Sequence, residues 1–146
     1  MLTHFEQKRL PYTKEQMFDL VADVASYKEF APWCVASRVN KLESDTVFLA
    51  DLVVGYKLFR EKFSSRVMLD KPHEISIEYL QGPLKNLSNI WQFSDDPEGE
   101  GCIIDFKVEF EFKNKALQSL ANIFFNEVVK RMVSAFETRA DQIYSK

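Results

Sequence analysis

The stretch CIIDFKVEFEF, residues 102–112, alternates apolar and charged side chains along most of its length. Successive side chains of a β-strand point to opposite faces, so this stretch predicts a strand with one dry face and one wet face. The dry face carries Ile104, Phe106, Val108, Phe110 and Phe112, and the wet face carries Asp105, Lys107, Glu109 and Glu111. This pattern is typical of an antiparallel sheet that is covered on one side only.

The cover for the dry face is predicted in residues 115–144. At 100° per residue, the apolar side chains of this segment fall on one broad arc of an α-helix. The arc contains Leu117, Leu120, Ala121, Phe124, Phe125, Val128, Met132, Val133, Phe136, Ala140 and Ile143. Such a helix measures about 45 Å, which is more than a small domain needs for capping alone. We therefore expect the sheet to curve around the helix.

Two short helices are predicted between a first strand, at residues 3–10, and the rest of the sheet. Thr13 and Gln16 have the spacing of a capping box, which predicts a helix that begins at Thr13. Ser26 is predicted to cap the second helix. That helix should end before Pro32, because the residue preceding a proline disfavours the helical conformation.

Residues 35–112 predict the remaining strands, separated by turns that contain Pro or Gly at residues 71–73, 80–83 and 95–99. Two of these strands also alternate clearly. One has Phe59, Phe63, Val67 and Leu69 on its apolar face, and the other has Leu87, Trp91 and Phe93. The prediction is a single α+β domain over residues 1–146, in which about six or seven antiparallel strands wrap around the C-terminal helix.

The composition argues against several classes of protein. The chain has 146 residues, a net charge of −3 and an isoelectric point of about 5.5. Nucleic-acid-binding domains usually carry a basic patch, so nucleic acid is not expected as a primary partner. No apolar run approaches the roughly 20 residues that span a bilayer, and the N-terminus lacks the apolar core of a signal peptide. Cys34 and Cys102 are far apart and are expected to be reduced thiols.

Residues that could carry catalysis or bind a metal are few. His4 and His73 are the two histidines, and both are expected to be exposed to solvent. Together with two scattered cysteines they have no metal-ligand spacing. The four glycines form no glycine-rich phosphate loop, and no nucleophile-elbow motif is present. We therefore expect no catalytic residue, no metal and no cofactor.

Polar residues interrupt the dry faces at Glu61, Ser65 and Asn89 on the strands and at Arg139 on the helix. A buried charge without a partner is costly, so Glu61 should be paired or should reach water. One interpretation places Glu61 at a flared strand end or in an internal pair with Arg139. Two others give Glu61 a contact with the head group of a ligand or a general acid–base role.

Four spaced segments carry a family resemblance: YKEFAPWC at residues 27–34, GPLKNL at 82–87, WQF at 91–93 and VVKRMVSAFETRA at 128–140. In this order they resemble the coenzyme Q-binding protein family of the START-like, polyketide-cyclase-like superfamily. The resemblance covers nearly the whole chain and implies the helix-grip fold (START or Bet v 1-like). The bacterial ribosome association toxin, a related branch, is similar in the second segment and in the helix. PWC at 32–34 and REKF at 60–63 look nearer the quinone-binding branch.

The resemblance implies a carrier or chaperone that binds ubiquinone, or a similar polyprenyl quinone, and supports quinone biosynthesis and respiratory electron transport. In this superfamily the volume between the sheet and the helix is a lipid tunnel. The implied lining is Phe30, Trp33, Phe59, Glu61, Phe63, Leu87, Asn89, Trp91, Phe110, Leu120, Phe124 and Val128. The lipid tail should dominate the affinity, because each buried CH₂ group contributes about 0.8 kcal/mol.

Two other functions stay open: a ribosome-associated factor of the association-toxin type, and a cyclase or aromatase-like enzyme with Glu61 as its acid or base. Ile123 lies on the polar arc of the helix beside Phe124 and Phe125, which suggests a transient membrane contact. A bacterial protein of this kind is expected in the cytoplasm or at the periphery of the inner membrane. A processed eukaryotic one is expected in the mitochondrion.

Overall fold

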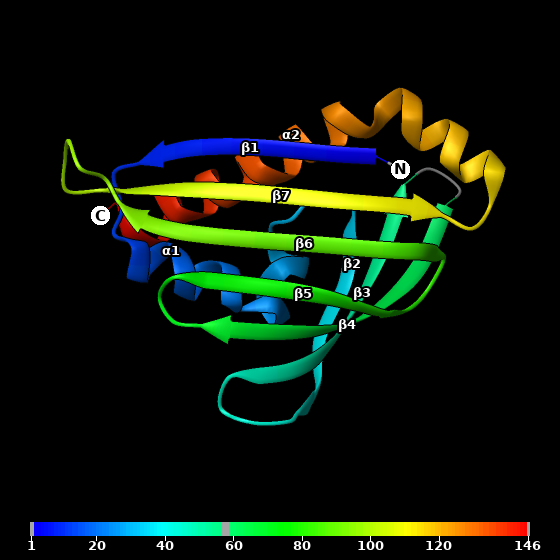
Figure 1. Ribbon diagram of the computed structural model, residues 1–146, viewed down its shortest axis with the longest axis horizontal. Helices are drawn as coiled ribbons and strands as arrows, with labels where there is room; N and C mark the ends of the chain where they lie inside the picture. The colour runs from blue at the N-terminus through cyan, green and yellow to red at the C-terminus, as the bar shows by residue number, and fades with distance from the viewer. Residues whose placement is uncertain (1, 57–58, 146) are drawn as a thin grey trace.

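Seven antiparallel strands form one sheet in the order β1-β7-β6-β5-β4-β3-β2 (Figure 1). We describe residues 2–56 and 59–145 of the computed structural model, without the side chains of Tyr56 and Phe59. The elements are β1 (Leu2–Leu10), α1 (Lys14–Ala22), the 3₁₀ helix η1 (Val24–Glu29), β2 (Cys34–Leu42), β3 (Val47–Tyr56), β4 (Phe59–Asp70), β5 (Glu74–Gln81), β6 (Leu84–Asp95), β7 (Cys102–Phe112) and α2 (Lys115–Tyr144). The predicted α+β architecture is confirmed.

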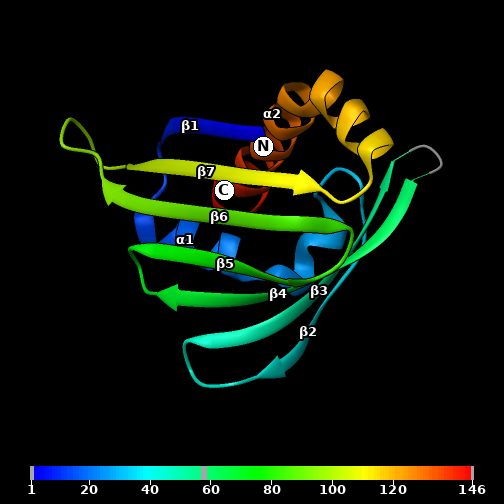
Figure 2. The same cartoon turned by 45° about the vertical axis from the view of Figure 1, so that its right-hand side comes forward.

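The helices cover one face of the sheet. In Figures 1 and 2, α1 and the C-terminal part of α2 lie behind β5, β6 and β7, the first half of α2 extends beyond β1, and β2 and β3 bend away from the plane of those strands. On β7, Phe106 is 2% exposed on the helix side, whereas Lys107 is exposed on the other side. The bounds of α2 also match the predicted helix, and Asn114 caps it by accepting hydrogen bonds from the N–H groups of Ala116 and Leu117. The predicted faces and helix are confirmed.

The helix pair follows the prediction at its start and departs from it at the second helix. The Thr13 hydroxyl accepts from the Gln16 N–H, and the Gln16 side chain accepts from the Thr13 N–H, so the capping box is confirmed. Ser26 does not cap the second helix, because η1 already begins at Val24. Val24, the first residue of η1, is 4% exposed. The Ser26 hydroxyl instead donates to the Asp23 carboxylate at 2.7 Å.

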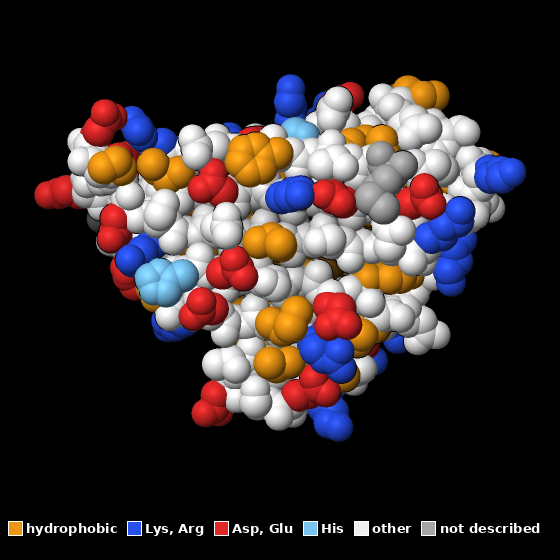
Figure 3. All heavy atoms as spheres, viewed as in Figure 1, with side chains coloured by type: hydrophobic (Ala, Val, Ile, Leu, Met, Phe, Trp, Pro, Cys, Tyr) orange, Lys and Arg blue, Asp and Glu red, His pale blue; other side chains and the backbone are white. Residues whose placement is uncertain are grey.

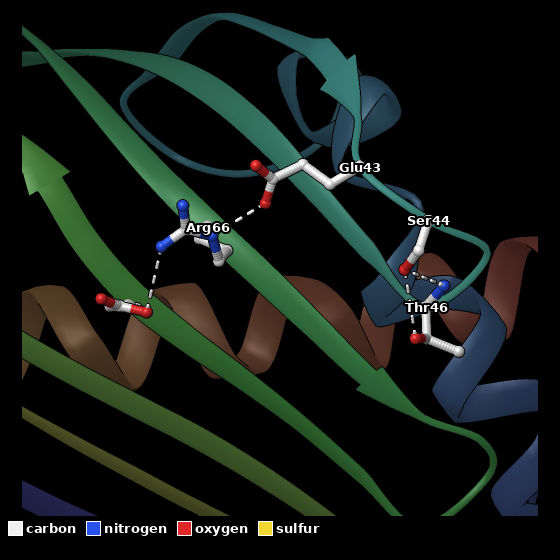
Figure 4. Close-up of polar contacts among 5 residues, drawn as sticks. Glu43, Ser44, Thr46 and Arg66 are labelled. Carbon is white, nitrogen blue, oxygen red and sulfur yellow. Dashed lines mark hydrogen bonds and ion pairs between the residues drawn. The ribbon is translucent and has the colours of Figure 1, made fainter.

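The face of the sheet away from the helices mixes apolar and charged side chains (Figure 3). Arg66 on β4 lies there between two carboxylates, 2.9 Å from Glu43 and 3.4 Å from Glu78. Figure 4 shows Arg66 beside Glu43, with Ser44 and Thr46 in the turn between β2 and β3. These ion pairs connect that turn to β4 and β5 across the surface of the sheet.

The N-terminal strand enters the sheet with its even-numbered residues facing α2. His4 was expected in solvent, and this expectation is wrong: its side chain is 11% exposed, and its ring centre lies 6.1 Å from that of Phe125. The cause is the pairing of β1 with β7, which sets His4 opposite Val108 on the covered face. His73 is exposed, as predicted.

The backbone is closely packed where β1 ends and β7 begins. At Gly101, just before β7, an added Cβ atom would lie 1.9 Å from the carbonyl oxygen of Leu10. Any side chain there would force apart the end of β1 and the start of β7, so only glycine fits this position.

Candidate functional site

Burial changes along the inward face of the sheet from one end to the other. On β7, Ile104, Phe106 and Val108 are at most 8% exposed, whereas Phe110 and Phe112 are only half-buried. The neighbouring strands repeat the change. On β6, β4 and β3 respectively, Phe93, Val67 and Phe48 are buried, while Leu87, Phe63 and Leu52 are half-buried.

The long helix shows the same change. Between Phe125 and Ala140 one side of the helix is buried, at Phe125, Val129, Val133, Phe136 and Ala140. In its first turns, Leu117, Ala121, Phe124 and Val128 are half-buried, and Leu120 is 40% exposed. We call the region formed by these residues and by Leu52, Phe63, Leu87, Phe110 and Phe112 the half-buried end. The opposite end, around Trp91, Phe106 and Phe136, is the closed core.

The closed core leaves almost no room for a ligand. A cavity between β1, β6, β7 and α2, lined by residues that include Trp91, Phe106 and Phe136, has a volume of about 10 Å³. That space is roughly what one water molecule needs. An apolar ligand would therefore displace side chains at the closed core, whereas the half-buried end already presents accessible apolar surface.

A strained turn borders the half-buried end. The N–H of Cys34 donates to the carbonyl of Ala31 at 3.2 Å, which closes a four-residue turn with Pro32 second and Trp33 third. Trp33 has a φ of +62°. Turns with proline second and a positive φ third favour glycine or asparagine there, and a bulky residue in that conformation is an outlier. Such strain concentrates at functional sites, so its conformation makes Trp33 a candidate residue of the site.

The turn is fixed against the hairpin of β3 and β4. The N–H of Gly55 donates to the carbonyl of Trp33 at 2.8 Å. A Cβ atom at Gly55 would lie 2.8 Å from a methyl group of Val35, so the close approach needs glycine. In Figure 2 the ends of β3 and β4 nearest this hairpin lie on the same side of the molecule as the first turns of α2. The Trp33 turn, this hairpin and α2 thus frame the half-buried end.

The structure brings together some of the residues predicted to line a ligand cavity and separates others. The half-buried end contains Phe63, Leu87, Phe110, Leu120, Phe124 and Val128, and Trp33 borders it. Trp91 instead lies in the closed core at 4% exposure, because α2 packs Phe136 against it. Phe30 lies apart as well, packed edge-on against Tyr27 and Phe136. The side chain of Phe59 lies outside the described residues.

Asn89 lies on β6 between Leu87 of the half-buried end and Trp91 of the closed core. Its side-chain amide donates to the carbonyl of Lys107 at 2.8 Å, and its oxygen accepts from the indole N–H of Trp91 at 3.1 Å. These bonds orient the side chain and satisfy Trp91, since a buried indole N–H without a partner would be costly. The oxygen retains a second lone pair, so it can accept one further hydrogen bond.

Glu61 and Arg139 do not pair. Glu61 is exposed near the start of β4, which agrees with the interpretation that places it at a flared strand end. Arg139 donates to Glu29 at 3.3 Å, and its guanidinium lies 5.2 Å from the centre of the Phe30 ring. The internal pair, which was the alternative placement of Glu61, is therefore not formed, because the side of α2 that carries Arg139 faces η1 and not β4.

A row of paired charges along β1 was not predicted from the sequence. The Nε2 atom of His4 lies 3.0 Å from Glu6, and Lys8 lies 4.0 Å from Glu6 and 3.6 Å from Glu137 on α2. Alternation of polar and buried character in residues 2–10 was too weak to reveal which side faces the helix. Pairing between charges lets this seam between β1 and α2 be partly buried.

Groups suited to metal binding or membrane spanning are not found in the described part of the chain. Within residues 2–56 and 59–145, no three His, Cys, Asp or Glu side chains are grouped so that they could hold a metal ion. None of the helices described combines the length and apolar character needed to cross a bilayer.

Comparison with known proteins extends over almost the whole chain. Residues 10–137 match the family described as polyketide cyclase / dehydrase and lipid transport. The mitochondrial coenzyme Q-binding protein COQ10 homolog B of Xenopus laevis is 40% identical, over 99% of this chain and 60% of that protein. The ribosome association toxin RatA of Rickettsia prowazekii is 33% identical, over 98% of this chain and 99% of that protein.

Solved structures agree with these matches. The solution structure of an 18 kDa protein from Caulobacter crescentus is 34% identical, with a TM-score of 0.79 over all of both chains. A START superfamily protein from Mycobacterium smegmatis has the same TM-score at 15% identity, over 97% of this chain and 98% of that one. The second likeness shows the fold alone, which is the START-like helix-grip fold expected from the sequence.

Proposed function

Because the chain belongs to the polyketide cyclase / dehydrase and lipid transport family, we propose that it binds a hydrophobic ligand at the half-buried end. The observation that carries the proposal is the change in burial along β3, β4, β6, β7 and α2, which leaves accessible apolar surface at one end of the inward face among the described residues. A lipid tail placed there would remove that surface from water. The residues proposed to contact it are Trp33, Phe63, Leu87, Phe110, Leu120, Phe124 and Val128.

The ligand that we propose is a polyprenyl quinone such as ubiquinone. The coenzyme Q-binding protein of Xenopus laevis supports this choice, although the chain spans only 60% of that protein's length. One buried isoprene unit of five carbons contributes roughly 3–4 kcal/mol before ordering costs, whereas a neutral hydrogen bond contributes about 0.5–1.5 kcal/mol. The tail thus supplies most of the affinity, and a single acceptor such as Asn89 adds selectivity for the head group.

The role proposed for this binding is that of a carrier or chaperone for the quinone, in support of quinone biosynthesis and respiratory electron transport. Such a protein works beside the membrane that holds the quinone pool, which is the inner membrane of a bacterium or of a mitochondrion. No chemical conversion of the ligand is part of the proposal.

Extraction of lipids from the purified protein tests this function. Protein expressed in a quinone-producing host should carry a polyprenyl quinone that mass spectrometry identifies, and protein from a quinone-deficient host should not. Added detergent should remove the quinone, since it supplies a competing apolar phase. Near-stoichiometric phospholipid or fatty acid without quinone would replace the quinone in the proposal by a general lipid.

A ribosome-associated role is the second candidate, and the RatA toxin of Rickettsia prowazekii favours it because that protein matches this chain over nearly its full length. Contact with ribosomal RNA rewards clusters of Lys and Arg, and the net charge of −3 opposes it. Co-sedimentation with ribosomal subunits in low salt, by protein that carries no lipid, would favour this candidate over the carrier.

A further inference from the structure

A groove on the outer side of α2 has a volume of about 500 Å³ and lies apart from the half-buried end. It runs between α2 and the C-terminal end of η1. Its lining is Glu29, Phe30, Lys130, Arg131, Ser134, Ala135, Thr138, Arg139 and Gln142. The lining combines three cations and one carboxylate, with hydroxyl and amide groups between them.

The charge of the groove is opposite to that of the whole chain. The four charged residues of the lining sum to +2, from Lys130, Arg131 and Arg139 against Glu29, while the chain carries −3. A hollow with an excess of one sign of charge attracts small ions of the other sign. The groove therefore favours an anionic ligand.

Arg139 is held in place for such a ligand. Its side chain is 24% exposed, its guanidinium lies over Phe30 at 5.2 Å, and it donates to Glu29 at 3.3 Å. Phe30 is itself packed edge-on against the buried Phe136. A guanidinium fixed in this way loses little freedom on binding, and its planar set of N–H donors suits phosphate oxygens.

The side of α2 that carries the groove presents an apolar residue toward the start of the helix. Arg131 is followed by Ser134, Thr138 and Gln142 in the C-terminal direction. Ile123, two turns before Lys130, is 73% exposed. The cations of the groove thus lie near an exposed apolar residue on the same helix. This arrangement suits an amphiphilic ligand and does not suit a nucleic acid backbone.

We propose that this groove binds the phosphate head group of an anionic membrane phospholipid, with Ile123 in contact with the apolar part of the bilayer. The cations at Lys130, Arg131 and Arg139 hold the phosphate. The site is separate from the ligand in the half-buried end and sets α2 against the membrane surface. It does not depend on which lipid the interior carries.

Sedimentation with vesicles tests the site directly. The full chain should bind vesicles of phosphatidylcholine that contain phosphatidylglycerol, and should bind pure phosphatidylcholine weakly. The double variant Lys130→Gln and Arg131→Gln should weaken partition to the anionic vesicles at least about tenfold, since each basic residue near such a surface contributes about 1 kcal/mol. Arg131 is exposed, and its side chain pairs with Glu127 at 2.7 Å on the same helix, so folding should be preserved.

Two comparisons make the result specific. Lys85→Gln with Lys107→Gln removes the same charge from exposed sites on the other face of the sheet, at 59% and 51% side-chain exposure, and should leave vesicle binding nearly unchanged. Ile123→Ser should weaken binding to vesicles and leave unchanged any chemical shift changes at Ser134 and Thr138 caused by soluble glycerol 3-phosphate. Equal losses in the two double variants would overturn the proposal, because they would show a general charge effect.

Binding of soluble phosphate and of ribosomal RNA shows whether the phosphate belongs to a membrane lipid. If Ile123→Ser has no effect on vesicle binding and glycerol 3-phosphate saturates the groove, the ligand is a soluble phosphate and the membrane assignment fails. If the groove variants lose binding to ribosomal RNA and not to vesicles, the proposal is equally overturned. Failure of vesicle binding does not affect the extracted-lipid result, so the two proposals are tested separately.

Discussion

The rings of Trp91 and Phe136 pack edge to face with their centres 5.0 Å apart, and this contact joins β6 to the second half of α2. Phe136 also meets Tyr27 and Phe30, each at 5.1 Å between ring centres. One side chain of α2 therefore fastens the sheet and the η1 segment to each other. The contact belongs to the closed core.

The two ends of the interior should respond differently to truncation. Phe136→Ala should lower the free energy of unfolding by roughly 3–5 kcal/mol, as expected for a fully buried ring. Phe124→Ala and Phe63→Ala, at half-buried positions, should cost less and should weaken lipid retention. Urea unfolding and lipid extraction on the same preparations measure both effects. A core-sized loss of stability in Phe63→Ala with unchanged lipid per folded molecule would make Phe63 a packing residue only.

The conformation of Trp33 predicts an unusual order of stability among its variants. Trp33→Gly and Trp33→Ala both remove the side chain, but only glycine adopts a φ of +62° without strain. Trp33→Gly should therefore be more stable than Trp33→Ala by roughly 1 kcal/mol, measured by urea unfolding. Both variants should lose lipid retention to a similar extent. Equal stability of the two would show that the turn relaxes in the absence of the indole.

Asp51 on β3 should contribute to stability in a pH-dependent way. Burial acts to raise the pKa of Asp51, but hydrogen bonds from Ser64 at 2.8 Å and Arg38 at 3.1 Å, with Lys62 nearby, outweigh it and lower the pKa. The folded protein thus binds a proton at Asp51 less readily than the unfolded chain does. The stabilisation is present above the unfolded value of about 3.9 and is lost as the pH falls through the lower folded value.

Comparison of the wild type with Asp51→Asn from pH 7 to pH 2 measures this contribution. The variant should be less stable at pH 7, and the difference should shrink below about pH 4. Asp45→Asn, at an exposed position in the turn before β3, serves as the control. If the difference in stability between the wild type and Asp51→Asn stays constant from pH 7 to pH 2, protonation of Asp51 does not contribute to the loss of stability in acid.

The two thiols should be slow to react in the folded protein. Burial raises the pKa of the Cys102 thiol to about 11, helped by the negative charges of Asp95, Glu15 and Asp96, and Cys102 is 0% exposed. Burial also raises the pKa of Cys34. Since the thiolate is the reactive form, a thiol reagent at pH 8 should modify Cys34 slowly and Cys102 only on unfolding. The variant Cys34→Ser leaves Cys102 as the reactive thiol. Rapid modification of Cys102 in this variant without denaturant would contradict its burial.

Glu61→Gln separates the enzyme alternative from the carrier. Because Glu61 is exposed, the substitution should change the free energy of unfolding by no more than about 0.5 kcal/mol. Lipid retention should be preserved, and quinones incubated with either protein should be recovered unaltered by mass spectrometry. A product formed by the wild type and absent with Glu61→Gln would establish an acid–base role and contradict the carrier proposal.

Periodicity in the sequence determined the architecture. The alternation in residues 102–112 and the arc over 115–144 each repeat a pattern many times, so their faces are specified redundantly, and the structure has the same faces and bounds. A one-residue slip of such a strand would expose every phenylalanine at once. The capping box at Thr13 is likewise local chemistry, complete within four residues.

Pairing across the chain decided the candidate site. Trp91 and Phe63 lie on similar alternating strands, yet one is in the closed core and the other at the half-buried end, because Phe136 of α2 reaches Trp91. Arg139 faces Glu29, which is 110 residues away along the chain, and not Glu61. Side-chain periodicity gives the face on which a residue lies, but the depth of burial depends on which distant element packs over that face. That packing is a property of the tertiary structure alone.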